Sequence, residues 1–130
     1  MKYHITKSVS NQDFPLLREK VIAALKEEGF GVLTEIDIQA TMKKKLDKDY
    51  LPFVILGACN PVFADKVLSI DPNMSALLPC NVSLRKLDSE EIEISAIDPI
   101  AAMSNLGNPA IEPLATEVRK KLENVVASVQ

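Results

Sequence analysis

Hydrophobic and polar residues alternate along four stretches of the chain, and this period of two predicts strands with one apolar face. The four stretches are residues 3–9, 30–38, 81–85 and 91–96. The run Phe53–Leu56 is apolar without alternation and therefore predicts a strand that is covered on both faces. Residues 87–90 lie between the last two alternating stretches and predict a hairpin.

Apolar residues recur at helical spacing in three longer segments. The first segment runs from Phe14 to Leu25 and ends near Gly29, a residue typical of helix C-terminal caps. The second follows Asn60-Pro61, and the third extends from Ile111 to Val129 with charged residues on its opposite side. A shorter helix that carries lysines is expected over 39–46.

Four of the eight prolines follow an asparagine or aspartate, at Asn60-Pro61, Asp71-Pro72, Asp98-Pro99 and Asn108-Pro109. Asn or Asp at a helix N-cap accepts a hydrogen bond from a free N–H, and proline at the next position loses only an unused donor. Each pair therefore predicts the start of a helix or a helical turn, with the side chains of Asn60 and Asp98 acting as caps.

The order of these elements predicts an α+β fold in one domain over residues 1–130. Hairpin-linked strands indicate a mainly antiparallel, curved sheet of about five strands, with the long helices packed on one face. The other face would be solvated or would bind a partner, and a second copy of the chain is the most common partner. We therefore expect a homodimer formed through the sheet face.

Composition narrows the function classes. The net charge of -3 argues against nucleic acid as a partner. No apolar run approaches the roughly 20 residues of a membrane span, so no membrane partner is expected. The N-terminus shows no secretory signal, and two cysteines without such a signal predict free thiols and a cytoplasmic location.

Both cysteines are followed by asparagine, in Cys59-Asn60 and Cys80-Asn81, 21 positions apart. Cys59 precedes a predicted helix start, where the helix dipole favours a thiolate and free N–H groups can bind an anion. The four residues are therefore our candidate ligand site, with Cys59 the best candidate for a catalytic thiol. The alternative is that both cysteines are small buried hydrophobic residues.

The two cysteines could also form a redox disulfide, which requires Cα atoms within about 7 Å. A shared metal is less favoured because a zinc site needs three or four ligands and no Cys-x-x-Cys cluster is present. We therefore expect no metal and no cofactor.

Other chemical candidates are weaker. The single histidine, His4, should face away from Ile5, toward the open face or solvent. Glu35 and Asp37 lie two apart on one strand and could act in acid–base chemistry, although a solvated face is more common. The lysines of the short helix and its end (Lys43, Lys44, Lys45 and Lys48) could bind phosphate or simply be solvated.

Four segments resemble, in order, the signature series of domain-of-unknown-function family 302. They are residues 29–37, 55–61, 77–82 and 95–99. The resemblance implies a fold like that of the TATA-binding protein, in a β-α-β(4)-α arrangement, and a dimer. It implies no particular activity.

Three hypotheses follow. The first is a small homodimeric protein that binds a small ligand or anion in a crevice lined by the two Cys-Asn segments. The second is a thiol-dependent redox protein or an enzyme that uses Cys59, and the third is an assembly protein with no small-molecule site. We favour the first and do not expect an enzyme.

Overall fold

The chain builds one sheet of five antiparallel strands, seen in a computed structural model that describes residues 2–130. The strand order is β1-β5-β4-β3-β2, so β1 and β2 form the two edges. The strands are β1 (His4–Val9), β2 (Gly31–Asp37), β3 (Phe53–Cys59), β4 (Cys80–Lys86) and β5 (Ile92–Ile97). The predicted hairpin joins β4 and β5, with Ser83 opposite Ser95.

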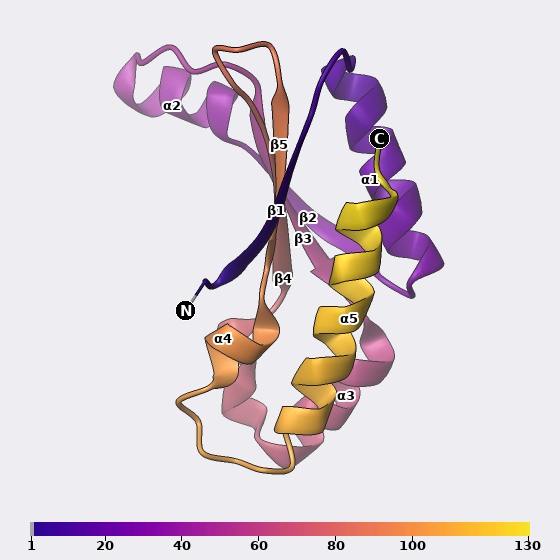
Figure 1. Ribbon diagram of the computed structural model, residues 1–130. Coiled ribbons are helices and arrows are strands. Elements are labelled where there is room, and N and C mark those ends of the chain that lie inside the picture. Colours follow the sequence, from indigo (N-terminus) through magenta and orange to yellow (C-terminus); the bar gives the residue numbers. More distant parts are fainter. Residues whose placement is uncertain (1) are drawn as a thin grey trace.

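Five helices and one 3-10 turn connect and cover the strands. They are α1 (Phe14–Glu27), α2 (Ile38–Leu46), α3 (Pro61–Ile70), the 3-10 turn η1 (Pro72–Leu77), α4 (Pro99–Met103) and α5 (Glu112–Ser128). In Figure 1 the sheet is viewed nearly edge-on, with α1, α3 and α5 all on one side of it. This arrangement confirms the predicted two-layer α+β fold, while the likeness to the TATA-binding protein stays a prediction.

The core lies between the sheet and the two long helices. Leu17, Val21 and Leu25 of α1 have no exposed surface, because apolar residues at this spacing form one stripe that faces the sheet. Leu122 of α5 and Leu56 of β3 are equally buried. Side chains of this kind stabilise a fold by roughly 1.5–3 kcal/mol each when fully buried.

Helix α2 does not join this layer. It buries none of its residues, and Figure 1 shows it on the opposite side of the sheet from α1 and α5. Its start is set by Asp37, whose side chain accepts a hydrogen bond from the Ala40 N–H at 2.9 Å, directly where β2 ends. The predicted packing of the long helices on one face is therefore confirmed, and the short helix α2 lies outside that layer.

Strand β2 departs from the predicted alternation because it contains an irregularity between Val32 and Thr34. The extra residue reverses the faces of the positions that follow it. Ile36 pairs with Ile55 on the open face and is 48% exposed, whereas Glu35 pairs with buried Leu56 and turns toward the helices. The expected strand residue Ile38 instead begins α2.

Three of the four Asx-Pro pairs begin helical elements, since α3, η1 and α4 start at Pro61, Pro72 and Pro99. The fourth forms a turn just before α5, in which the Asn108 side chain accepts a hydrogen bond from the Ala110 N–H at 3.0 Å. The predictions of helix or helical-turn starts are therefore confirmed.

Candidate functional site

The two cysteines lie at the same end of the sheet because their strands are antiparallel neighbours. β3 ends at Cys59, β4 begins at Cys80, and Cys80 is the register partner of Ala58. Both cysteines line one cavity of about 30 Å³ beneath α3, α4 and α5, which we call the cysteine cavity. Apart from Asn60, its walls are apolar, with Phe30, Phe63, Met103 and Leu114 among them.

The cavity is small. A volume of about 30 Å³ accommodates one or two water molecules or a single ion. An organic ligand would have to displace side chains in order to enter.

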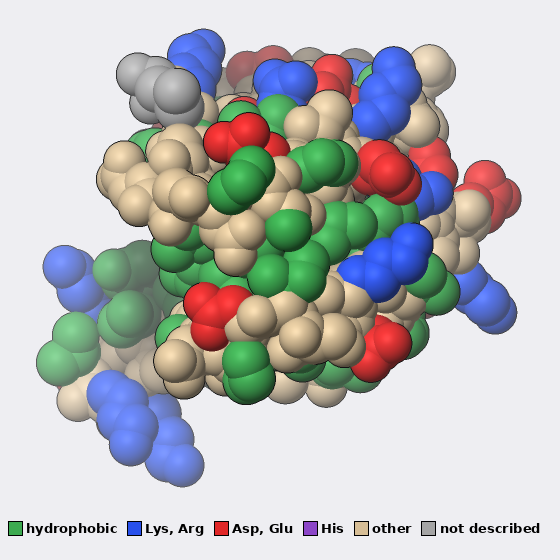
Figure 2. All heavy atoms as spheres, turned by 90° about the horizontal axis from the view of Figure 1, so that it is seen from below, with side chains coloured by type: hydrophobic (Ala, Val, Ile, Leu, Met, Phe, Trp, Pro, Cys, Tyr) green, Lys and Arg blue, Asp and Glu red, His purple; other side chains and the backbone are tan. Residues whose placement is uncertain are grey.

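The surface around this end of the molecule is also apolar. Figure 2, which views the molecule from below Figure 1, shows hydrophobic side chains gathered in the middle and charged side chains toward the margins. Exposed Ile70, Leu77 and Ile100 come from α3, η1 and α4, and exposed Leu106 follows α4.

Neither cysteine is in a disulfide, and both are partly buried. Burial raises the pKa of the Cys80 thiol to about 11, and the neighbouring Cys59 contributes a smaller effect in the same direction. Desolvation disfavours the thiolate, so Cys80 is protonated at neutral pH and is a poor nucleophile.

Asn60 occupies the N-cap position of α3, but its side chain makes no capping hydrogen bond. The prediction that this side chain caps the helix is therefore wrong. Its Nδ2 donates instead to the Glu28 carbonyl at 3.3 Å, beside Gly29, which has a φ of 86°. A Cβ at Gly29 would lie 3.0 Å from Asn60 Nδ2, so the left-handed glycine lets the end of α1 approach Asn60 closely.

Asn81 lies on the other face of the sheet. Successive strand residues point to opposite faces, so Cys80 faces the helices and Asn81 is exposed on the open face. There it lines a shallow hollow of about 240 Å³ with Tyr3, Ile55 and Ser83. The structure therefore brings Cys59, Asn60 and Cys80 together and places Asn81 apart from them.

His4 also lies on the open face, and it contacts neither cysteine. Its Nδ1 is hydrogen-bonded to the Thr6 hydroxyl, which is hydrogen-bonded at 2.8 Å to Ser95. A Cys-His pair is therefore not formed.

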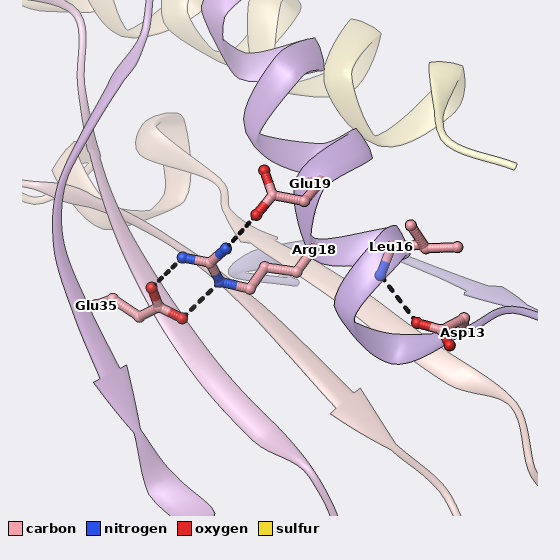
Figure 3. Close-up of polar contacts among 5 residues, drawn as sticks. All are labelled: Asp13, Leu16, Arg18, Glu19 and Glu35. Atoms are coloured by element: carbon pink, nitrogen blue, oxygen red, sulfur yellow. Dashed lines mark hydrogen bonds and ion pairs between the residues drawn. The ribbon is translucent and has the colours of Figure 1, made fainter.

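Glu35 and Asp37 have separate structural partners. Figure 3 shows Arg18 of α1 reaching Glu35 with two nitrogens, its Nε at 2.7 Å and its Nη2, and bonding Glu19 at 2.6 Å. The hydrogen bond from Arg18 lowers the pKa of Glu35. Since Asp37 caps α2, the two carboxylates do not form an acid–base pair.

Asp98 caps α4 as predicted, accepting hydrogen bonds from the Ile100 N–H at 2.9 Å and the Ala101 N–H at 3.4 Å. Its other oxygen accepts from Arg119 Nε of α5 at 3.0 Å, which the sequence did not indicate. Asp98 thus fastens α4 to α5, and α4 supplies Pro99 and Met103 to the cavity wall.

The lysine cluster is partly neutralised. Lys43 lies 3.0 Å from Asp47 and 3.1 Å from Asp49, and all three are well exposed. Pairs this exposed contribute little to stability because water screens them, which fits a solvated helix.

Within residues 2–130, no three His, Cys, Asp or Glu side chains are placed to hold a metal ion together. Met103, which was not among the predicted site residues, also lines the cysteine cavity. No local pattern indicated Met103, because its position depends on how α4 packs against α5.

The structure thus defines a two-layer α+β protein whose candidate site is a small apolar cavity at one end of the sheet. Residues 5–129 match the family described as "Domain of unknown function DUF302". The chain belongs to this family.

A solved structure is similar over its whole length. It is described as the uncharacterized conserved protein DUF302 from Bacillus stearothermophilus, with 27% sequence identity, a TM-score of 0.91 and coverage of 100% of both chains. No curated protein matches the chain. In the part of the chain that the structure describes, no helix is both long and apolar enough to cross a membrane.

Proposed function

We propose that this protein binds a small ligand in the cysteine cavity and acts as a binding protein rather than as an enzyme. The observation that supports this most directly is the joint contribution of Cys59, Asn60 and Cys80 to one apolar cavity. Two polarisable sulfur atoms in an otherwise apolar cavity favour a soft or neutral ligand over a hydrated anion.

The surroundings of the thiols argue against catalysis. A nucleophilic cysteine is normally activated by an adjacent base, and the one histidine lies on the open face. The carboxylates of Glu35, Asp37 and Asp98 are held by their own partners. The alternative, a redox or catalytic role for Cys59, predicts rapid alkylation of that thiol by iodoacetamide, whereas a binding role predicts slow labelling of both thiols.

Native mass spectrometry of the protein as purified tests the binding function. We expect a non-covalent adduct that is lost on denaturation and absent from Ala64→Leu, which fills the cavity from α3. Ala127→Leu adds the same volume at an exposed position of α5 and should keep the adduct. An adduct that survives in a folded Ala64→Leu variant would place the ligand elsewhere.

We further propose a homodimer through the open sheet face. Tyr3 is 67% exposed and Ile36 is 48% exposed, beside the hollow that contains Ile55. Light scattering coupled to gel filtration should give a dimer mass that falls to the monomer in Ile36→Lys. Leu16→Lys on α1, where Leu16 is 63% exposed outside this face, should stay dimeric. A monomeric wild type would contradict the proposal.

The two unpaired thiols favour a reducing compartment such as the cytoplasm. Export to an oxidising compartment, seen by cell fractionation, would contradict this location.

A further inference from the structure

The ligand class follows from a second space beside the cysteine cavity, and the inference rests on the binding function proposed above. We propose that the ligand is a slender aliphatic chain with a neutral head group that donates a hydrogen bond, as in a long-chain alcohol. Its tail enters the cysteine cavity through a groove between α4 and α5, and its head stays at the outer rim of that groove.

The groove between α4 and α5 adjoins the cysteine cavity. It has a volume of about 220 Å³, and Met103 and Ala115 line both the groove and the cavity. These two side chains therefore form the boundary between the two spaces. Met103 is only partly buried, and its unbranched side chain has three rotatable bonds. A change of the Met103 rotamer can thus join the groove to the cavity.

The groove has an apolar floor and a polar rim. On the floor, Ile111 is 2% exposed and Ala115 is 4% exposed. Ser104, Glu112 and Thr116 also line the groove, and all three are exposed. An amphipathic ligand therefore buries its tail along the floor and keeps its head among the three rim residues.

The rim residues select a head group that donates. Ser104 Oγ already donates to the Ala101 carbonyl at 3.1 Å. Thr116 Oγ1 donates to the Glu112 carbonyl at 3.0 Å. A hydroxyl has one proton, so both hydroxyls can only accept a further hydrogen bond, and an ionised carboxylate also only accepts. A hydroxyl or amide head satisfies these acceptors.

The charges around the groove disfavour an acidic head group. No lysine or arginine is among the described residues that line the groove, whereas Glu112 is a carboxylate. Arg119, one helical turn after Ala115, is held by Asp98 at 3.0 Å and by Glu123 at 2.7 Å. A carboxylate or phosphate head would therefore meet a like charge without a free cation to offset it.

The available space suits one narrow chain. The cavity of about 30 Å³ and the groove of about 220 Å³ together stay below the roughly 300–1,000 Å³ of pockets for drug-sized ligands. At the inner end, the protonated Cys80 thiol behaves as a small hydrophobic group and can contact the end of a tail.

A titration of the full chain with linear alcohols from hexanol to dodecanol tests the proposal, followed by NMR of isotope-labelled methionine methyl groups. We expect the Met103 signal to shift and the signal of Met42, on α2, to stay unchanged. Kd should fall about 4-fold for each added methylene and level off once the tail fills the cavity. In Ala64→Leu, which fills the cavity alone, Kd should level off at a shorter chain.

Ile100→Glu places a charge in the groove wall and should weaken decanol binding by at least about 10-fold. Val62→Glu is the matched control, because Val62 also follows the first proline of its helix, is exposed and lines neither space. It should leave Kd unchanged. Decanoate should bind at least about 10-fold more weakly than decanol. Circular dichroism verifies that each variant is folded.

Equal shifts at Met42 and Met103, unchanged binding in the folded Ile100→Glu variant, or decanoate bound as tightly as decanol would overturn the proposal. If no alcohol shifts Met103 but a copurified adduct is lost in Ala64→Leu, the aliphatic ligand fails and the binding function stands. If neither an alcohol nor an adduct is bound, both fail.

Discussion

Gly57 is the position at which one added methyl group should disturb the structure most clearly. It lies in β3, which has a neighbouring strand on each side and therefore little freedom to shift. A Cβ at Gly57 would lie 2.2 Å from Thr34 Oγ1 and 2.9 Å from Pro79 Cγ, well inside van der Waals contact. We predict that Gly57→Ala is destabilising.

The magnitude follows from two opposing effects. Overpacking of a well-filled site typically costs about 1–3 kcal/mol, and replacing glycine with alanine gains about 0.4–1 kcal/mol through the unfolded state. The net loss should be about 1–2 kcal/mol in the free energy of unfolding. Since about 1 kcal/mol corresponds to roughly 4 °C for a domain of this size, Tm should fall by roughly 4–8 °C.

Urea unfolding of a double-mutant cycle measures the contact with Thr34. Thr34→Ala is an exposed change that should be nearly neutral alone, and it should remove about half of the Gly57→Ala penalty, with the remainder due to Pro79. Gly31→Ala is the matched control, because a Cβ there meets nothing within 4 Å. Equal stability of Gly57→Ala and wild type, or a penalty that Thr34→Ala does not change, would refute the reasoning.

Three further predictions concern charges and a cap. Glu35→Gln should lower the free energy of unfolding by about 0.5–1 kcal/mol at neutral pH, after allowance for solvent screening. Because the pKa of Glu35 is lowered in the folded state, chemical denaturation should show this difference fading as pH falls below 4.5. A difference that grows in acid would contradict the Arg18 pair. Burial raises the pKa of Cys80 from 9.0 to about 11, so the thiol of the unfolded chain ionises first. The wild type should therefore lose stability relative to Cys80→Ala as pH rises through this interval, measured by chemical denaturation. Parallel pH profiles for the two proteins would argue against a buried thiol. Asp37→Ala removes a helix cap worth about 1 kcal/mol from α2, a helix that buries no residue. Amide hydrogen exchange should therefore accelerate in α2 alone. Acceleration across β3 and β4 would show instead that α2 supports the sheet.

The helices and strands in which apolar residues recur at an uninterrupted helical or strand spacing could be predicted from the sequence. In α1 and α5 the apolar stripe and the buried stripe coincide, as at Leu17 and Leu122, because one face must be removed from water. In β2 the predicted alternation of apolar and polar residues is wrong after Val32. A single extra residue in the strand reverses which side chains face the helices, and no residue type in the sequence marks its position.

The candidate site could be predicted only in part. Cys59 and Cys80 were identified, and the antiparallel register of β3 and β4 then places them at one cavity. The roles of Asn60 and Met103 depend on how helices pack against the sheet, which no local pattern encodes. Asn60 contacts the end of α1, 32 residues earlier, and Met103 reaches the cavity through the contact of α4 with α5.

The repeated Cys-Asn pair is therefore one sequence pattern with two structural outcomes. At the end of β3 the chain turns into α3, so Asn60 leaves the strand and remains on the cavity side. At the start of β4 the strand continues, so strict alternation sends Asn81 to the open face. The cysteines lie at one end of the sheet because their strands are antiparallel neighbours. The asparagines lie apart because Cys80 pairs with Ala58, on the side to which Asn60 returns, whereas Asn81 pairs with Gly57 on the other side. Ligand binding at the cavity should accordingly depend on both cysteines and be insensitive to Asn81→Ala. Dimerisation should instead be sensitive to Asn81→Ala and insensitive to substitution of the cysteines.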